Sequence, residues 1–153
     1  MGYGVVEVGA DGPRALDYGV LTTPPTAPAG ERLRTLYQGL VTVIERNHPS
    51  QVAIELFVAR NLRSALSVGQ ARGVAILAAA QSGLPTHDYT PSQVQRSVTY
   101  GKGRKEKWQI QEMVRLQLGL EKIPQPDDAA DALAVALCHI RQAEAARLLS
   151  QAT

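Results

Sequence analysis

The chain has 153 residues, of which 44% are apolar and 20% are charged, a composition that fits one globular domain and excludes a disordered chain. No apolar run reaches the roughly 20 residues that cross a bilayer, the first residues lack the pattern of a secretory signal, and the net charge of +2 identifies no partner. The one cysteine, Cys138, cannot form an internal disulfide, which favours the reducing cytoplasm. We expect a single domain over residues 1–153.

The first third of the chain predicts a β-hairpin followed by a helix. Residues 2–8 and 15–22 read as strands on either side of a turn at residues 11–13, which is hairpin spacing. After a proline-rich loop, residues 31–46 carry leucine, valine and isoleucine at the spacing of an amphipathic helix. Pro49 ends this helical pattern.

The rest of the chain interleaves short strands with helices. Strands are expected at residues 51–57 and 85–89, and helices at 61–82, 91–98, 105–118 and 127–150. We expect Asp127 to be the N-cap of the last helix. Strands that alternate with helices after an antiparallel hairpin predict an α/β fold with a mixed sheet.

A glutamate interrupts one of the expected strands. Glu55 lies within Val-Ala-Ile-Glu-Leu-Phe, where a central strand should be continuously apolar. An unpaired buried carboxylate is costly. Glu55 is therefore either an exposed glutamate at a strand end or a residue that binds a cation.

Two aspartates share one face of the last expected helix. Asp128 and Asp131 are three residues apart, and the like charges should destabilise the helix, although the helix N-terminus offsets part of this repulsion. They are either ordinary residues of a helix start or, together with Glu55, oxygen ligands for one or two Mg²⁺ ions.

Basic and acidic residues are concentrated in separate segments. Between residues 96 and 107 five basic residues accompany one acid, and between residues 121 and 131 four acids accompany one lysine. This pattern fits a nuclease, in which cations hold phosphates and carboxylates hold metal. It equally fits a plain surface loop beside an acidic helix start.

Several segments, taken together and in this order, resemble the RuvC family of Holliday junction resolvases. The resemblance covers nearly the whole chain and is carried by residues 2–5, Ala53-Ile54-Glu55, residues 65–75, residues 106–111 and Asp128-Ala129-Ala130-Asp131-Ala132-Leu133-Ala134. It implies an RNase H-like nuclease domain that acts as a homodimer on four-way DNA junctions. It also implies two Mg²⁺ (or Mn²⁺) ions per active site and the RuvA–RuvB branch-migration complex as a partner.

The resemblance also assigns roles to individual residues. Glu55, Asp128 and Asp131 would be metal ligands and, together with Lys107, catalytic residues. Phe57 would stack at the junction crossover, unless it is a core residue. The residues expected to contact DNA are Phe57, Arg60, Asn61, Arg96, Lys102, Arg104, Lys105 and Lys107. The glycine pair at residues 69 and 73 would lie in the dimer interface or pack on the protein's own sheet.

One part of the family pattern is not matched. The family has a first strand that bears an aspartate in the metal site, just before the segment that resembles residues 2–5. In this sequence Met1 directly precedes that segment, so we expect the strand and its aspartate to be missing. The alternatives are a junction-binding protein that does not cleave and an RNase H-like enzyme that acts on RNA, as in the YqgF group.

Overall fold

The structure is a computed structural model that describes residues 1–101 and 103–153. Its strands are β1 (Gly2–Gly9), β2 (Gly12–Val20), β3 (Val52–Glu55) and β4 (Thr86–Tyr89). Its helices are α1 (Ala29–Asn47), α2 (Leu62–Gln81), α3 (Pro91–Thr99), α4 (Lys107–Gln117) and α5 (Asp127–Gln151). The expected order of strands and helices is confirmed.

Three boundaries differ from the expected ones in ways that affect the site. Strand β3 ends at Glu55 instead of residue 57, and α4 begins at Lys107 instead of residue 105. The N-cap of α5 is Pro126, so the prediction for Asp127 was wrong. Pro126 has the extended backbone of an N-cap, and the Asp127 carboxylate bonds to side chains of α4 instead of to its own helix.

The strands of the expected mixed sheet form two separate pairs. β1 pairs with β2 antiparallel, with a bulge between Val5 and Val6, and β3 pairs with β4 parallel. Within the described residues no hydrogen bonds join the two pairs into one sheet. The described strands thus have the antiparallel and parallel pairings of a mixed sheet, divided into two pairs.

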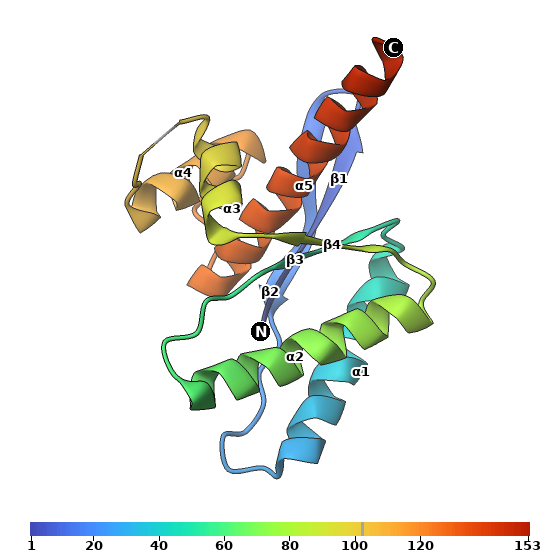
Figure 1. Ribbon diagram of the computed structural model, residues 1–153, viewed down its shortest axis with the longest axis vertical. Helices are drawn as coiled ribbons and strands as arrows, with labels where there is room; N and C mark the ends of the chain where they lie inside the picture. Colours follow the sequence, from blue (N-terminus) through green and yellow to red (C-terminus); the bar gives the residue numbers. More distant parts are fainter. Residues whose placement is uncertain (102) are drawn as a thin grey trace.

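Helix α5 organises the fold. It runs along the hairpin and also packs against α3, α4 and both strands of the second pair (Figure 1). The buried core lies on this side of the molecule and is formed by Tyr89, Val94, Val98, Val114, Leu118, Leu133, Ala134, Val135, Leu137 and Cys138. On the other side α1 packs against α2, and Val43 is the buried residue of α1.

The structure also tests two residues of the last helix. Cys138 is fully buried in the core, as expected for a small apolar side chain. His139 has a structural role, because its ring nitrogens bond to the Tyr89 hydroxyl at 2.7 Å and to Gln51 at 2.5 Å. None of the helices in the described part of the chain is both long enough and apolar enough to span a membrane.

Candidate active site

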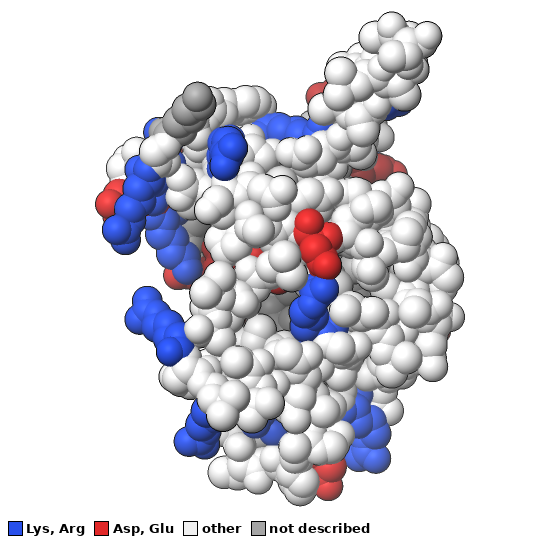
Figure 2. All heavy atoms as spheres, in the orientation of Figure 1, with Lys and Arg blue, Asp and Glu red and all other residues white. Residues whose placement is uncertain are grey.

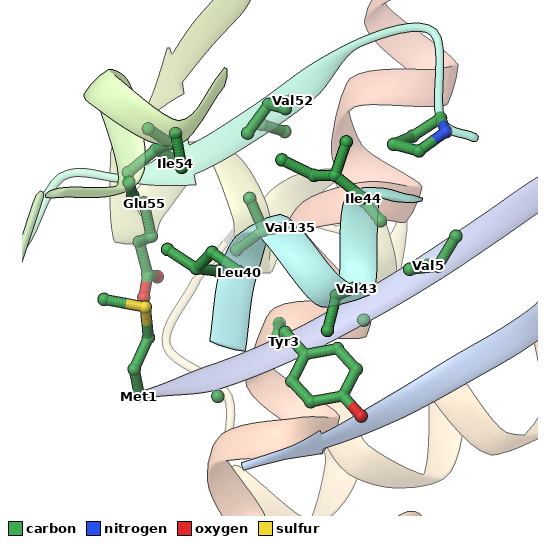
Figure 3. A pocket seen from close by; sticks show the side chains of 18 of the residues that line it. Met1, Tyr3, Val5, Leu40, Val43, Ile44, Val52, Ile54, Glu55 and Val135 are labelled. Carbon is green, nitrogen blue, oxygen red and sulfur yellow. The ribbon is translucent and has the colours of Figure 1, made fainter. Parts of the chain in front are cut away.

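Glu55 is the last residue of β3, and its side chain points into a large cavity (Figure 3). The side chain is partly buried, and the described part of the chain supplies no hydrogen-bond partner for it. Burial raises the pKa of the Glu55 carboxyl, and the negative charge of Asp131 raises it further. Glu55 is thus a strand-end residue held close to a second acid.

Asp128 and Asp131 lie in the first two turns of α5, as the sequence predicted. Asp128 is exposed and Asp131 is partly buried. Burial raises the pKa of Asp131, and the charge of Asp128 acts in the same direction, although Lys107 partly opposes this change. The helix start can approach β1 because Gly2 has no side chain: a Cβ on Gly2 would lie 2.1 Å from the Asp128 carbonyl oxygen.

Lys107 bridges the acids at the start of α5. Its Nζ lies 3.2 Å from Asp127 Oδ2 and 3.6 Å from Asp131 Oδ2. The Gln111 amide also donates a hydrogen bond of 3.0 Å to Asp127. Burial acts to lower the pKa of Lys107, but the two aspartates outweigh it, and the pKa is raised. Lys107 therefore stays protonated beside the candidate ligands.

The donor set has the right chemistry for a hard divalent cation, since all three candidate ligands offer carboxylate oxygens. With the side chains as they stand, however, no three His, Cys, Asp or Glu residues in the described ranges are close enough together to hold a metal ion. The positive charge near Asp131 comes instead from Lys107. A bound cation would require these side chains to move toward one another.

The segment that joins β3 to α2 contains three of the expected DNA contacts. Phe57 is 58% exposed, so the alternative that it is a core residue was wrong. Arg60 and Asn61 are also exposed. Asn61 additionally has a structural role, because its side chain caps α2 by accepting a 2.9 Å hydrogen bond from the Ser64 amide.

The other expected DNA contacts lie around the loop between α3 and α4. Arg96 and Arg104 line a hollow of about 590 Å³, together with Gly101 and Gly103. Lys105 is partly exposed, and Lys102 lies outside the described residues. Figure 2 shows lysine and arginine side chains along the side of the molecule that carries α3 and α4, with acidic atoms close by.

Comparison with known proteins places the chain in a family. The family model described as crossover junction endodeoxyribonuclease RuvC matches residues 1–139. The chain belongs to the RuvC family. The RuvC of Chloroflexus aurantiacus is 55% identical over 140 residues, which are 91% of this chain and 85% of the relative. The RuvC of Desulfitobacterium hafniense is 52% identical and is covered to 84%.

Solved structures support the same assignment. The structure described as T. thermophilus RuvC in complex with Holliday junction substrate has a TM-score of 0.86 and 39% identity, over 92% of this chain and 86% of that one. A second Thermus thermophilus RuvC structure also has a TM-score of 0.86, with 36% identity. The likeness to RuvC confirms the expected RNase H-like fold class.

Asp127 has a role in this site that differs from the one expected from the sequence. It was expected to cap its own helix, but it holds Lys107 and Gln111 of α4. The lysine lowers the pKa of Asp127 through a hydrogen bond, and Gln111 lowers it further. In the sequence Asp127 is an acid directly before Asp128, and this position does not predict which helix its side chain contacts.

Proposed function

We propose that this chain is a structure-selective endonuclease that resolves four-way DNA junctions by phosphodiester hydrolysis. One observation carries the proposal: Glu55 at the end of β3 and Asp128 of α5 line the same cavity, and Lys107 lies 3.6 Å from Asp131 in the next turn of that helix. The raised pKa of Glu55, caused by burial and by the charge of Asp131, agrees with this arrangement. Groups whose pKa is shifted by burial and by a specific neighbour are typical of active sites. Family membership names the substrate class of the relatives, crossover junctions in DNA.

Glu55, Asp128 and Asp131 would hold Mg²⁺ or Mn²⁺, with two ions per active site. A metal bound there would supply an activated water and stabilise the leaving oxygen. Lys107 would neutralise the phosphate that is cleaved, once it is released from Asp127 and Asp131. Arg96, Lys102, Arg104 and Lys105 would hold neighbouring phosphates, since backbone contacts dominate the affinity of nucleic-acid binding.

The segment after β3 would contact the unpaired region of the junction. The exposed ring of Phe57 offers a face on which a base can stack. Arg60 and Asn61 lie next to it along the chain and could contact the backbone nearby. We further propose that residues 1–153 act as a single nuclease domain in the cytoplasm, together with the RuvA–RuvB complex.

A homodimer is supported by one face of α2. Leu62, Leu66 and Ile76 are 74%, 60% and 36% exposed. With Gly69 and Gly73 they follow the alternating spacing of four and three residues that is typical of paired helices. A Cβ on either glycine would meet nothing within 4 Å in the described structure, so neither glycine packs on the protein's own sheet. A second subunit could approach this face closely.

The second candidate function is junction binding without cleavage. It is favoured by the observation that, over the residues described, no three potential ligands gather into a metal site. The two functions are separated by adding the protein to a labelled four-way junction with Mg²⁺ and measuring mobility shift and strand cleavage on the same samples. A linear duplex of the same sequence is the control. Cleavage of the junction alone supports the nuclease, and binding without cleavage supports the second candidate.

A further inference from the structure

Arg141 of α5 contacts the ends of two other helices. Its guanidinium donates hydrogen bonds to the Ser97 carbonyl oxygen in the last turn of α3, to the Tyr100 hydroxyl and to the side-chain oxygen of Gln117, the last residue of α4. Figure 1 shows α3 and α4 beside each other and packed against α5. Arg141 therefore joins three helices at one point.

The contacts of Arg141 suit an arginine in particular. The guanidinium carbon lies 4.0 Å from the centroid of the Tyr100 ring, which is within the range of a cation–π contact. A planar guanidinium can stack on a ring and donate several hydrogen bonds in fixed directions, whereas the ammonium of lysine is a compact charge without this geometry. A lysine at position 141 would keep the charge and lose the arrangement.

The charge of Arg141 is balanced by the end of a helix. Within residues 1–101 and 103–153 no carboxylate forms an ion pair with Arg141. Its partner Ser97 belongs to the last turn of α3, where free carbonyl oxygens carry a partial negative charge. The Arg141 side chain is partly buried and its donors are bonded within the protein. It would have to give up these bonds to contact a DNA phosphate.

Gln117 extends the same contact from α4 to α3. Its side chain accepts a hydrogen bond from Arg141 and donates one of 2.7 Å to the Val98 carbonyl oxygen. The side chains of Val98 and Val114, one from each helix, are buried in the core. This end of the pair of helices is therefore fixed on α5 by both apolar packing and hydrogen bonds.

Tyr100 determines the direction in which the chain leaves α3. It is the C-cap of this helix and has a left-handed backbone with φ of 54°. Such a backbone is unfavourable for a residue with a large side chain and persists where the surroundings hold it. Although Tyr100 is 72% exposed, both its ring and its hydroxyl contact Arg141. Arg141 thus holds the residue at which the loop begins.

The loop that follows Tyr100 carries several of the expected DNA contacts. Residues 101–106 lead to α4 and include Arg104, which is exposed, and Lys105, which is partly exposed. The Gln95 side chain holds the middle of this loop through a 2.7 Å hydrogen bond to the Gly103 carbonyl oxygen. A loop that is held before binding loses less conformational entropy when it contacts a ligand.

The two ends of this loop differ in their expected behaviour when DNA binds. At the far end, Lys107 is paired with Asp127 and Asp131, and under the proposed function it would leave them for the cleaved phosphate. At the near end, Arg141 and Tyr100 contact each other and have no assigned role with metal or DNA. The near end can therefore stay fixed while the far end is released.

We propose that Arg141 is a positioning residue for DNA binding. By holding Tyr100 and the ends of α3 and α4, it presents the cations of the loop to the DNA backbone and does not itself touch the DNA. This inference rests on the proposed function, because it assumes that the loop contacts a four-way junction. Its consequence is that Arg141 acts through the cations of residues 101–106.

The first test measures the affinity of the full chain for a labelled four-way junction in metal-free buffer. Arg141→Ala should weaken binding by roughly three- to tenfold, because the freed loop must be ordered when DNA binds. Arg141→Lys should weaken it to a similar extent, since lysine keeps only the charge. Arg147→Ala is the matched control, because it removes the same charge from an exposed position of α5. Full affinity of Arg141→Lys would make Arg141 a direct phosphate contact and would overturn the proposal.

A double-mutant cycle tests whether Arg141 acts through the loop. The variant with Lys102, Arg104 and Lys105 replaced by alanine removes the cations of residues 101–106. In that background Arg141→Ala should have little further effect on affinity at low salt, because residues that act as a unit give non-additive losses. Additive losses would show that Arg141 acts elsewhere, and the positioning role would be wrong.

Limited trypsin digestion tests the loop without DNA. Trypsin cleaves after lysine and arginine, so the three cations of the loop are cleavage sites, and a segment that is released from its contacts is cleaved faster. Arg141→Ala should speed cleavage in the loop several-fold and leave cleavage after Arg60, in the segment after β3, unchanged. Tyr100→Ala should have the same effect, and its exposed side chain is not needed for the core.

The digestion separates failure of this inference from failure of the proposed function. Unchanged cleavage in the loop of both variants would show that Arg141 does not hold it. Faster cleavage at Arg60 as well would indicate a general loss of stability, and either result overturns the positioning role. If the loop is released as expected but the parent binds a junction no better than a linear duplex, the proposed function is contradicted and the contact between Arg141 and the loop stands.

Discussion

The surroundings of Glu55 destabilise its carboxylate, and its side chain lies in the candidate active site. Burial and the nearby charge of Asp131 raise its pKa. An acid whose pKa is higher in the folded than in the unfolded state contributes most stability below its unfolded pKa, and this contribution is lost as the pH rises through the folded pKa. At neutral pH Glu55 therefore lowers stability relative to acidic pH, a cost that is common at functional sites.

Glu55→Gln should abolish cleavage of a four-way junction and leave binding largely intact, because phosphate contacts dominate affinity. The same variant should raise the melting temperature at about pH 7, and this gain should shrink toward about pH 4, where the native glutamate is protonated. Cleavage gels, mobility shifts and thermal scans measure the three effects. Glu45→Gln on the exposed side of α1 is the matched control. A folded Glu55→Gln variant that cannot bind the junction would contradict the assignment.

Lys107→Ala should lose more cleavage than binding. One phosphate contact among many changes affinity only modestly, whereas a donor aimed at charge that develops in the transition state is worth about 3 kcal/mol, or roughly a hundredfold in rate. Single-turnover cleavage and equilibrium binding separate the two. Lys122→Ala, an exposed lysine away from the ion pairs, is the control. If affinity falls as steeply as rate, Lys107 is a general DNA contact.

Among the helices and strands, the close packing of β1 on α5 attaches the hairpin to the rest of the fold. The contact depends on glycine, because a Cβ on Gly4 would lie 2.7 Å from the Leu133 side chain and 3.0 Å from its backbone nitrogen. The backbone nitrogen of Leu133 cannot move away from this Cβ by a side-chain rotation. The same approach places Gly2 against Asp128, so a shift of β1 also disturbs the start of α5.

Gly4→Ala should therefore lower the free energy of unfolding by about 1–3 kcal/mol, the usual cost of overpacking. For a chain of this size, each kcal/mol lost lowers the melting temperature by roughly 2–4 °C. Gly30→Ala is the matched control, since its Cβ would meet nothing within 4 Å in the described structure and alanine favours the first turn of α1. Thermal denaturation of both variants tests the contact. Equal melting temperatures would show that β1 can move without cost.

For the whole molecule, the proposed homodimer would bring two active sites together. Leu66→Glu, in the middle of the exposed face of α2, should weaken the dimer because it places a charge among apolar side chains. The monomer should keep its fold, since Leu66 is 60% exposed. Sedimentation velocity measures the change, with Leu148→Glu on the exposed end of α5 as the control. If the parent protein sediments as a dimer and the Leu66→Glu variant sediments in the same way, the interface lies elsewhere.

The order of elements could be predicted from the sequence because its signals are local. Alternation in the hairpin, helical spacing in residues 31–46 and the acidic start of α5 depend on residues that are neighbours along the chain. The site residues could be proposed for a related reason: Glu55 breaks an apolar strand, and Asp128 and Asp131 share a helix face. These features are visible before any folding is considered.

Only the tertiary structure decided what depends on distant parts of the chain. The strands form two pairs because only some strand edges are hydrogen-bonded to another strand. Phe57 is exposed because β3 ends before it, at Glu55. The ion pair of Lys107 with Asp127 joins the starts of two helices that are separated by a turn and a loop. Edge pairing, burial and ion pairs are set by contacts in space, and periodicity along the sequence does not contain them.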